Sequence, residues 1–295
     1  MAHTSFQTLS ASLDRDSLPM RLYQKAKRLG IWDPYELDLS RDRADWLSLT
    51  DKQREVLLQL TSLFQAGEES VTLDLLPLLL VIAREGRLEE ELFLTSFLWE
   101  EGKHTEFFRR VLDEVCVETG DLTRFHGPSY RRLFYEELPA SMAALIDDPS
   151  PTMQARAVVT YTMIVEGVLA ETGYYSYFES LEQNDLLPGL RSGVAKLKQD
   201  ESRHIAYGIY LLARLLAEHD VWSTIETRMA ELLPLAMGVI DESLSGYGEL
   251  PFGLAPEQFV EYATSQFGKR LARLELARTQ TLAEVVADES LDSNV

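Results

Sequence analysis

Two copies of the pattern Glu-x-x-His are the residues of this chain whose types and spacing suggest metal chemistry. They are Glu101-Gly-Lys-His104 and Glu201-Ser-Arg-His204. Positions i and i+3 lie on one face of an α-helix, so each pair can direct a carboxylate oxygen and an imidazole nitrogen to the same point. The repetition of the pattern predicts two half-sites for metal ions rather than one isolated histidine.

Each pair follows a single glutamate by about the length of a helical hairpin. Glu68 precedes Glu101 by 33 residues, and Glu166 precedes Glu201 by 35. Two such hairpins packed face to face form a four-helix bundle with four carboxylates and two imidazoles at its centre, as in ferritin-like di-metal proteins. We therefore expect six metal ligands, which are Glu68, Glu101, His104, Glu166, Glu201 and His204.

The neighbours of Glu166 argue most strongly for a ligand. This residue lies in the apolar segment TMIVEGVLA, where an unpaired carboxylate would cost several kcal/mol and a metal ion would remove that cost. Oxygen-rich ligands with one imidazole per ion favour iron or manganese over zinc or copper. The remaining histidines, His3, His126 and His219, lack matching partners and are predicted to be surface residues.

An acidic residue precedes each paired glutamate, at Glu100 and Asp200. A metal-bound imidazole commonly donates its other N–H to a carboxylate, so these two acids are candidates for that role. An ion pair within the helix, such as Asp200 with Arg203, fits the sequence equally well.

Helical periodicity along nearly the whole chain predicts an all-α fold. An irregular start ends near Thr50, where TDKQ has the form of a capping box. The helix that carries Glu68 is interrupted by Pro77, and Gly86 marks the turn into a second helix over residues 93–115. A polar segment over residues 120–132 connects the two hairpins.

The second hairpin begins at Ser150-Pro151, a capping residue followed by proline, and its first helix is closed by LLPGL at 186–190. We expect one ferritin-like domain over residues 1–295, with the metal-binding bundle at about 50–215. Additional flanking helices are predicted at about 221–245 and 256–284, and a disordered acidic tail after about 286.

Composition restricts the partners and the compartment. The net charge is −20 and no basic run occurs, which argues against binding to nucleic acid or to anionic membranes. No apolar run is long enough for a transmembrane segment. The single cysteine, Cys116, lies in an apolar helical stretch and favours a reducing cytoplasm. We expect a soluble cytoplasmic protein.

The six-residue arrangement resembles the ribonucleotide reductase small-subunit superfamily over residues of about 50–215. Two positions depart from its radical-forming subunits. Phe108 stands where most of them have a tyrosine, and Glu68 where they usually have an aspartate. With these differences, and with Val71 and Tyr161, the chain is more similar to the ligand-binding oxidases related to that subunit.

This resemblance implies a manganese–iron pair, with two iron ions as the alternative, a long-chain fatty acid as ligand, and reaction with O2. Manganese would be held by Glu68, Glu101 and His104, and iron by Glu166, Glu201 and His204. The reaction would join Val71 and Tyr161 through an ether bond. Val71 is three residues after Glu68, but Tyr161 is five before Glu166, about 140° around an ideal helix. A π-bulge would bring Tyr161 to the metal pair.

Three other functions share the same ligand set. A ribonucleotide reductase subunit of the tyrosine-free type is compatible with Phe108, but the tail ADESLDSNV lacks aromatic anchors for a large subunit. A ferritin-like storage protein is usually much shorter, whereas the helices after residue 220 favour a closed homodimer. A related di-iron monooxygenase or desaturase is also consistent with four glutamates and two histidines.

Overall fold

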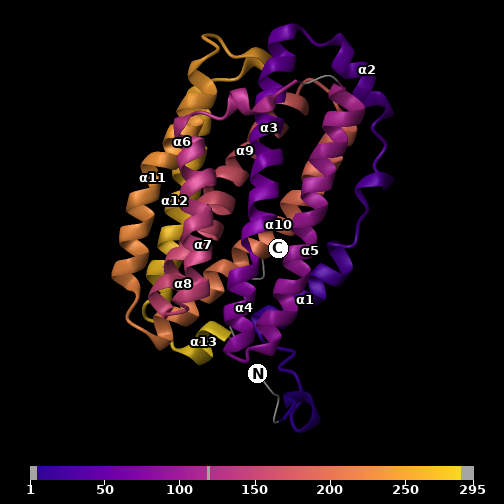
Figure 1. Ribbon diagram of the computed structural model, residues 1–295. Coiled ribbons are helices and arrows are strands. Elements are labelled where there is room, and N and C mark those ends of the chain that lie inside the picture. Colours follow the sequence, from indigo (N-terminus) through magenta and orange to yellow (C-terminus); the bar gives the residue numbers. More distant parts are fainter. Residues whose placement is uncertain (1–4, 118–119, 287–295) are drawn as a thin grey trace.

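The predicted ligands lie on four helical rods of the structure, which is a computed structural model. Figure 1 shows how the helices run side by side. It describes residues 5–117 and 120–286, and these residues form helices and no strand, so the predicted all-α fold is confirmed. Three rods are single helices, α3 (Asp51–Asp74), α5 (Leu88–Val111) and α10 (Pro188–Glu218). The fourth rod is continuous through α8 (Pro151–Val158), the π-helical segment η6 (Val159–Ala170) and α9 (Glu171–Leu181).

The expected boundary signals act at the ends of the first hairpin. Thr50 and Gln53 form a capping box at the start of α3, because the side chain of each accepts a hydrogen bond from the backbone N–H of the other. The rod breaks before Pro77, so that α3 ends at Asp74 and α4 (Leu76–Arg84) follows. Gly86 has φ of +72° at the turn into α5, a conformation that glycine adopts without strain.

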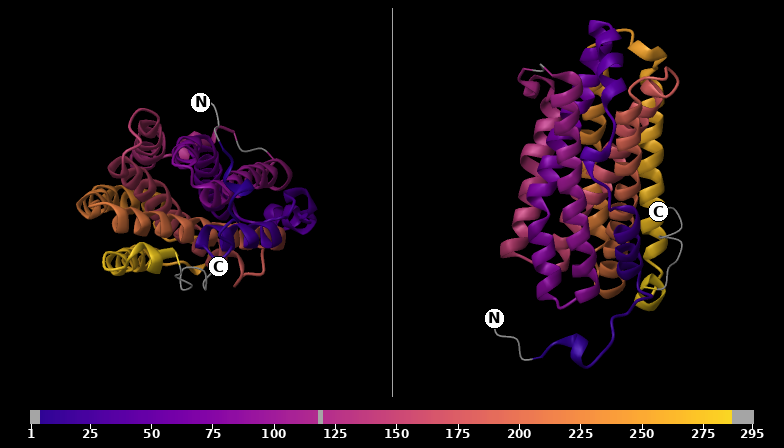
Figure 2. Two further views of the ribbon diagram at one scale, coloured as in Figure 1. Left: turned by 90° about the horizontal axis from the view of Figure 1, so that it is seen from below. Right: turned by 90° about the vertical axis from the view of Figure 1, so that its right-hand side faces the viewer.

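Further helices cover the bundle. Helices α11 (Trp222–Ser245) and α12 (Pro256–Ala277) pack against η6, and α1 (Leu18–Leu29) packs against α5 and α10. Figure 2 shows these layers along and across the bundle. The other elements are η1 (Gln7–Leu9), η2 (Pro34–Glu36), α2 (Ser40–Ser48), η3 (Leu112–Cys116), η4 (Leu122–Phe125), α6 (Pro128–Tyr130), η5 (Arg131–Glu137), α7 (Leu138–Asp147), η7 (Pro251–Gly253) and α13 (Leu282–Val286).

Three sequence-based boundaries were wrong. The start of the chain contains α1 and α2, and α1 buries Leu18, Leu22 and Ala26 at helical spacing. The segment 186–190 begins α10 instead of closing the preceding helix, because Pro188 occupies its first turn, where a missing N–H costs nothing. The last predicted helix divides into α12 and α13, because Thr281 and Glu284 form a new capping box. The predicted tail lies outside the described residues.

The fourth rod and α10 approach each other closely at Gly208. A Cβ atom on this glycine would lie 2.1 Å from Thr162 Oγ1, so a larger residue would push the two rods apart. This contact is one turn beyond His204 on α10 and one turn before Glu166 on η6. Glycine at position 208 therefore allows α10 and η6 to pack closely beside the metal ligands.

None of the helices in the described part of the chain is both long enough and apolar enough to cross a membrane.

Candidate metal centre

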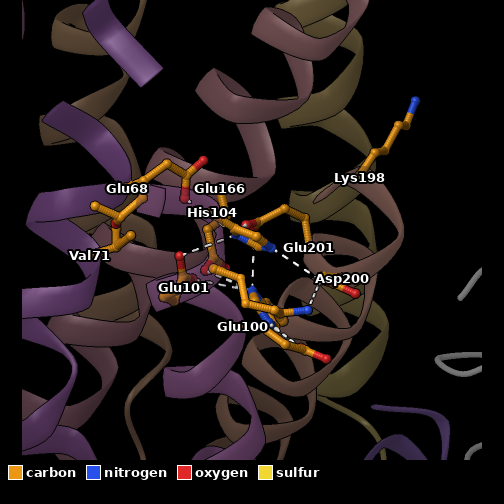
Figure 3. Close-up of polar contacts among 12 residues, drawn as sticks. Glu68, Val71, Glu100, Glu101, His104, Glu166, Lys198, Asp200 and Glu201 are labelled. Carbon is orange, nitrogen blue, oxygen red and sulfur yellow. Dashed lines mark hydrogen bonds and ion pairs between the residues drawn. The ribbon is translucent and has the colours of Figure 1, made fainter. Parts of the chain in front are cut away.

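The six predicted ligands meet in the middle of the bundle, as Figure 3 shows for the glutamates and His104. None of the six is more than 5% exposed. Their ligand atoms form two groups, and within each group all atoms lie within 4.8 Å of one another. Glu101 and Glu201 belong to both groups, so these two carboxylates are placed to bridge two ions. The groups are Glu68, Glu101, His104 and Glu201, and Glu101, Glu166, Glu201 and His204.

Both imidazoles direct Nδ1 toward the carboxylates. His104 Nδ1 is 3.2 Å from Glu201 Oε1 and 3.4 Å from Glu68 Oε2. His204 Nδ1 is 3.3 Å from Glu101 Oε1 and 3.7 Å from Glu166 Oε1. Each histidine can therefore contribute Nδ1 to one group while Nε2 points away from it.

Several polar atoms of this cluster are buried without a hydrogen-bond partner among the described residues. They are Glu101 Oε2, His104 Nδ1, both carboxylate oxygens of Glu166, Glu201 Oε2 and His204 Nδ1. Each such atom lowers the stability of the folded protein by about 1–3 kcal/mol or more, because burial removes it from water and gives it no other partner. Metal ions would satisfy all of them at once, so the residues fit a pair of cations.

Electrostatics in the cluster also favour added positive charge. Burial raises the pKa of Glu68 to about 8 and raises the pKa of Glu166 well above its ordinary value. For Glu101, burial is outweighed by the favourable electrostatic interactions of its carboxylate with the imidazoles of His104 and His204, which lower its pKa to about 2. Protons thus balance part of the negative charge, and bound cations would displace them.

The acids beside the paired glutamates contact the opposite histidines. Glu100 Oε2 lies 2.9 Å from His204 Nε2, and Asp200 Oδ2 lies 3.2 Å from His104 Nε2. Glu100 on α5 therefore orients the imidazole of His204 on α10, and Asp200 on α10 orients that of His104 on α5. The alternative ion pair of Asp200 with Arg203 is also present, so the two interpretations of these acids coexist.

Two buried cations and an indole complete the surroundings of these acids, and of the three only Arg203 was expected there, as a partner of Asp200. Arg203 Nη2 is 2.5 Å from Glu100 Oε1, and Lys103 Nζ is 3.1 Å from Asp200 Oδ2. Trp32 Nε1 donates to Asp200 over 2.9 Å. Lys103 lies inside the first Glu-x-x-His motif and was open to the same interpretation as Arg203. Trp32 is 168 residues from Asp200, in a segment predicted to be irregular, and gave no signal.

Val71 and Tyr161 lie next to the cluster on different rods. The hydroxyl of Tyr161 is 3.3 Å from Glu101 Oε1 and 3.3 Å from the backbone oxygen of Val71. Tyr161 is in the π-helical segment η6, whose wider turn accounts for a residue that an ideal α-helix would direct elsewhere. Phe108, one turn beyond His104, packs against Phe64 with ring centroids 5.0 Å apart and brings no hydroxyl to the site.

A cavity extends from the cluster toward the surface. Glu68, Glu101, Glu166 and Glu201 form its inner end. Apolar residues of α3, η6, α11 and α12 make up most of its walls, and α9 adds Thr172, Gly173, Ser176 and Ser180. It encloses about 1090 Å³ with its open mouth included. Leu250 and Leu254, on either side of η7, also line it.

His126 is not the surface residue that we expected. It is 7% exposed, and its Nε2 is 3.1 Å from Ser62 Oγ while its Nδ1 is 2.8 Å from the hydroxyl of Tyr135. These contacts attach the connection between the hairpins to α3. His219 is exposed as predicted, and His3 lies outside the described residues.

Comparisons with known proteins agree with this geometry. The family model "Ribonucleotide reductase, small chain" matches residues 19–279. An R2-like ligand-binding oxidase with aerobically reconstituted Mn/Fe cofactor is 39% identical, with a TM-score of 0.89, over 92% of this chain and 98% of that chain. The same kind of oxidase after photoconversion is 38% identical, with a TM-score of 0.87, over 92% and 99% of the two chains.

Proposed function

The chain belongs to the ribonucleotide reductase small-chain family, and we propose that within it the protein is a ligand-binding oxidase with one manganese and one iron ion. Members of the family are dinuclear-metal oxidoreductases, so the chain is an enzyme of that class. The observation that carries the proposal is the pair of ligand groups that share Glu101 and Glu201. The Mn/Fe cofactor of similar oxidases supports the choice of metals.

Manganese would occupy the group with Glu68 and His104, and iron the group with Glu166 and His204. When bound, the pair supplies the electrons that activate O2. The chain's own residues orient the ligands through Glu100 and Asp200 and exclude bulk water from the centre.

The proposed reaction on the protein itself is an ether bond between Val71 and Tyr161. It would remove the hydrogen of the Tyr161 hydroxyl and the hydrogen on the β-carbon of Val71, and O2 would be the oxidant that takes up the two electrons and two protons. Hydrogen bonds to Glu101 Oε1 and to the backbone oxygen of Val71, both at 3.3 Å, hold the Tyr161 hydroxyl beside the valine.

Peptide mapping tests the cross-link. After aerobic loading with manganese and iron, we expect a linked pair of peptides that is lighter by two hydrogens than the two separate peptides. Protein loaded without O2 and the Tyr161→Phe variant serve as controls and should give only separate peptides. Unlinked Val71 and Tyr161 peptides in fully loaded, O2-treated protein would refute the cross-link and favour the tyrosine-free reductase subunit.

We further propose that the cavity binds a long-chain fatty acid. Its walls are apolar, while its inner end holds four carboxylates that would repel an acid head group without bound cations. Metal ions there would convert that end into an acceptor for a carboxylate. Mass spectrometry of organic extracts should identify a long-chain acid in protein purified from cells, and its absence would contradict lipid binding.

We propose a homodimer that buries exposed apolar side chains of α3, α4 and α5. They are Leu73, Leu76, Leu80 and Trp99, which are 68%, 55%, 40% and 49% exposed. Burial of such side chains against a second copy would remove them from water. Light scattering should give twice the chain mass for the wild type and a smaller mass for Leu76→Glu.

Because Cys116 is a buried free thiol, we also propose that the protein works in a reducing cytoplasm.

A further inference from the structure

Gln59 is a buried polar side chain that faces the apolar cavity without a partner. It is 9% exposed, and its side chain has no hydrogen-bond partner among the described residues. Its amide opens into the cavity rather than into packed protein. An acyl chain that fills the cavity would remove water from this amide, so a polar group on that chain would have to replace the lost partner.

The wall of the cavity opposite Gln59 is formed by α9, and it presents hydroxyl groups at the same height along the bundle as Gln59. A contact of 2.8 Å between Thr61 Oγ1 and the hydroxyl of Tyr177 fixes the antiparallel register of α3 and α9. Gln59, just before Thr61, therefore faces the turn of α9 from Ser176 to Ser180, and all three line the cavity. Both serines donate to backbone oxygens within α9. Their oxygens keep lone pairs that can accept a hydrogen bond.

This polar level is far from the metal end of the cavity. Gln59 precedes Glu68 by nine residues, which is about 13 Å along α3 at 1.5 Å per residue. Leu60, Leu63 and Phe64 line the cavity between the two levels. A plain acyl chain would fill the apolar part but would offer only C–H groups to the Gln59 amide.

We propose that the cavity selects an acyl chain that carries an oxygen function, such as a hydroxyl group, well away from its carboxylate. Gln59 is then the specificity-determining residue, because its amide can both donate to and accept from that hydroxyl. The hydroxyl has one proton to donate, so Ser176 or Ser180 accepts it when the Gln59 amide donates to the hydroxyl oxygen. The inference rests on the lipid-binding function proposed above and narrows its substrate class to oxygenated fatty acids.

Oleate and ricinoleate are suitable probes, because they differ in one hydroxyl group near the middle of the chain. Their affinities would be measured calorimetrically on delipidated, metal-loaded protein. We expect wild type to bind ricinoleate about tenfold more tightly, the ratio that one net hydrogen bond of about 1.4 kcal/mol gives. In Gln59→Leu the preference should vanish while oleate binds at least as tightly as before. Gln24→Leu, an exposed position on α1, is the matched control.

Two results would overturn this inference and leave the proposed lipid-binding function standing. One is equal affinity of wild type for both acids, and the other is an equal loss of both affinities in Gln59→Leu, which would show that the residue holds the head group or the fold. Ser180→Ala provides a second variant, and it should reduce the preference for ricinoleate. If wild type binds neither acid, the proposed lipid-binding function fails, and this inference fails with it.

Discussion

Glu100 on α5 and His204 on α10 are joined across the bundle, with Glu100 Oε2 2.9 Å from His204 Nε2. Asp200 and His104 form the reverse pair, at 3.2 Å. Each motif therefore orients the imidazole of the other, so the two halves of the centre are assembled together. Because the free N–H of each ring is fixed, Nδ1 faces the carboxylates.

Glu100→Gln should weaken metal binding by about 10–100-fold, the usual effect of losing a carboxylate partner of a metal-bound histidine. An amide offers one acceptor oxygen where the carboxylate serves both His204 and Arg203. The measurement is competition against a chelator of known affinity. Glu106→Gln, an exposed position on the same helix, should bind as wild type does, and unchanged affinity in Glu100→Gln would contradict the positioning role.

Substitutions of shared and unshared carboxylates should differ in stoichiometry. Glu101 belongs to both ligand groups, whereas Glu68 belongs to one. We expect Glu101→Gln to lose both ions and Glu68→Gln to keep the ion held with His204. Metal analysis of purified variants gives the count per chain. Equal losses in the two variants would show that Glu101 is not a bridging ligand.

The metal-free protein should lose stability as the pH rises. The folded pKa of Glu68, about 8, exceeds its ordinary value of 4.5 because of burial, so the folded state holds an extra proton between these values. That stabilisation is complete below about pH 4.5 and is lost as the pH rises toward about 8. The pKa values of His104 and His204 are also raised by the carboxylates, although burial opposes this, and they act in the same direction.

Chemical denaturation of metal-free protein across this range measures the effect. Glu68→Gln should flatten the dependence, because it removes one of the groups that gain a proton on folding. Metal affinity should change in the opposite sense and increase with pH, since binding releases those protons. Rising stability of the metal-free wild type between about pH 5 and pH 8 would contradict this electrostatic account.

Local spacing made much of this centre predictable, and tertiary packing determined the rest. The repeated Glu-x-x-His pattern and the buried position of Glu166 identified residues that the structure brings together, because helical periodicity is a short-range property. No residue pattern signals a π-helix, so the orientation of Tyr161 could only be inferred from resemblance. Trp32 and Gln59 were missed because their importance depends on contacts with distant segments or on the shape of a cavity.

Anomalous scattering at the manganese and iron absorption edges, from crystals of aerobically loaded protein, tests the central claim most directly. We predict one manganese peak among Glu68, Glu101, His104 and Glu201, and one iron peak among Glu101, Glu166, Glu201 and His204. Both peaks should be lost in Glu101→Gln. A single ion, or ions bound outside these six residues, would contradict a dinuclear centre at this site.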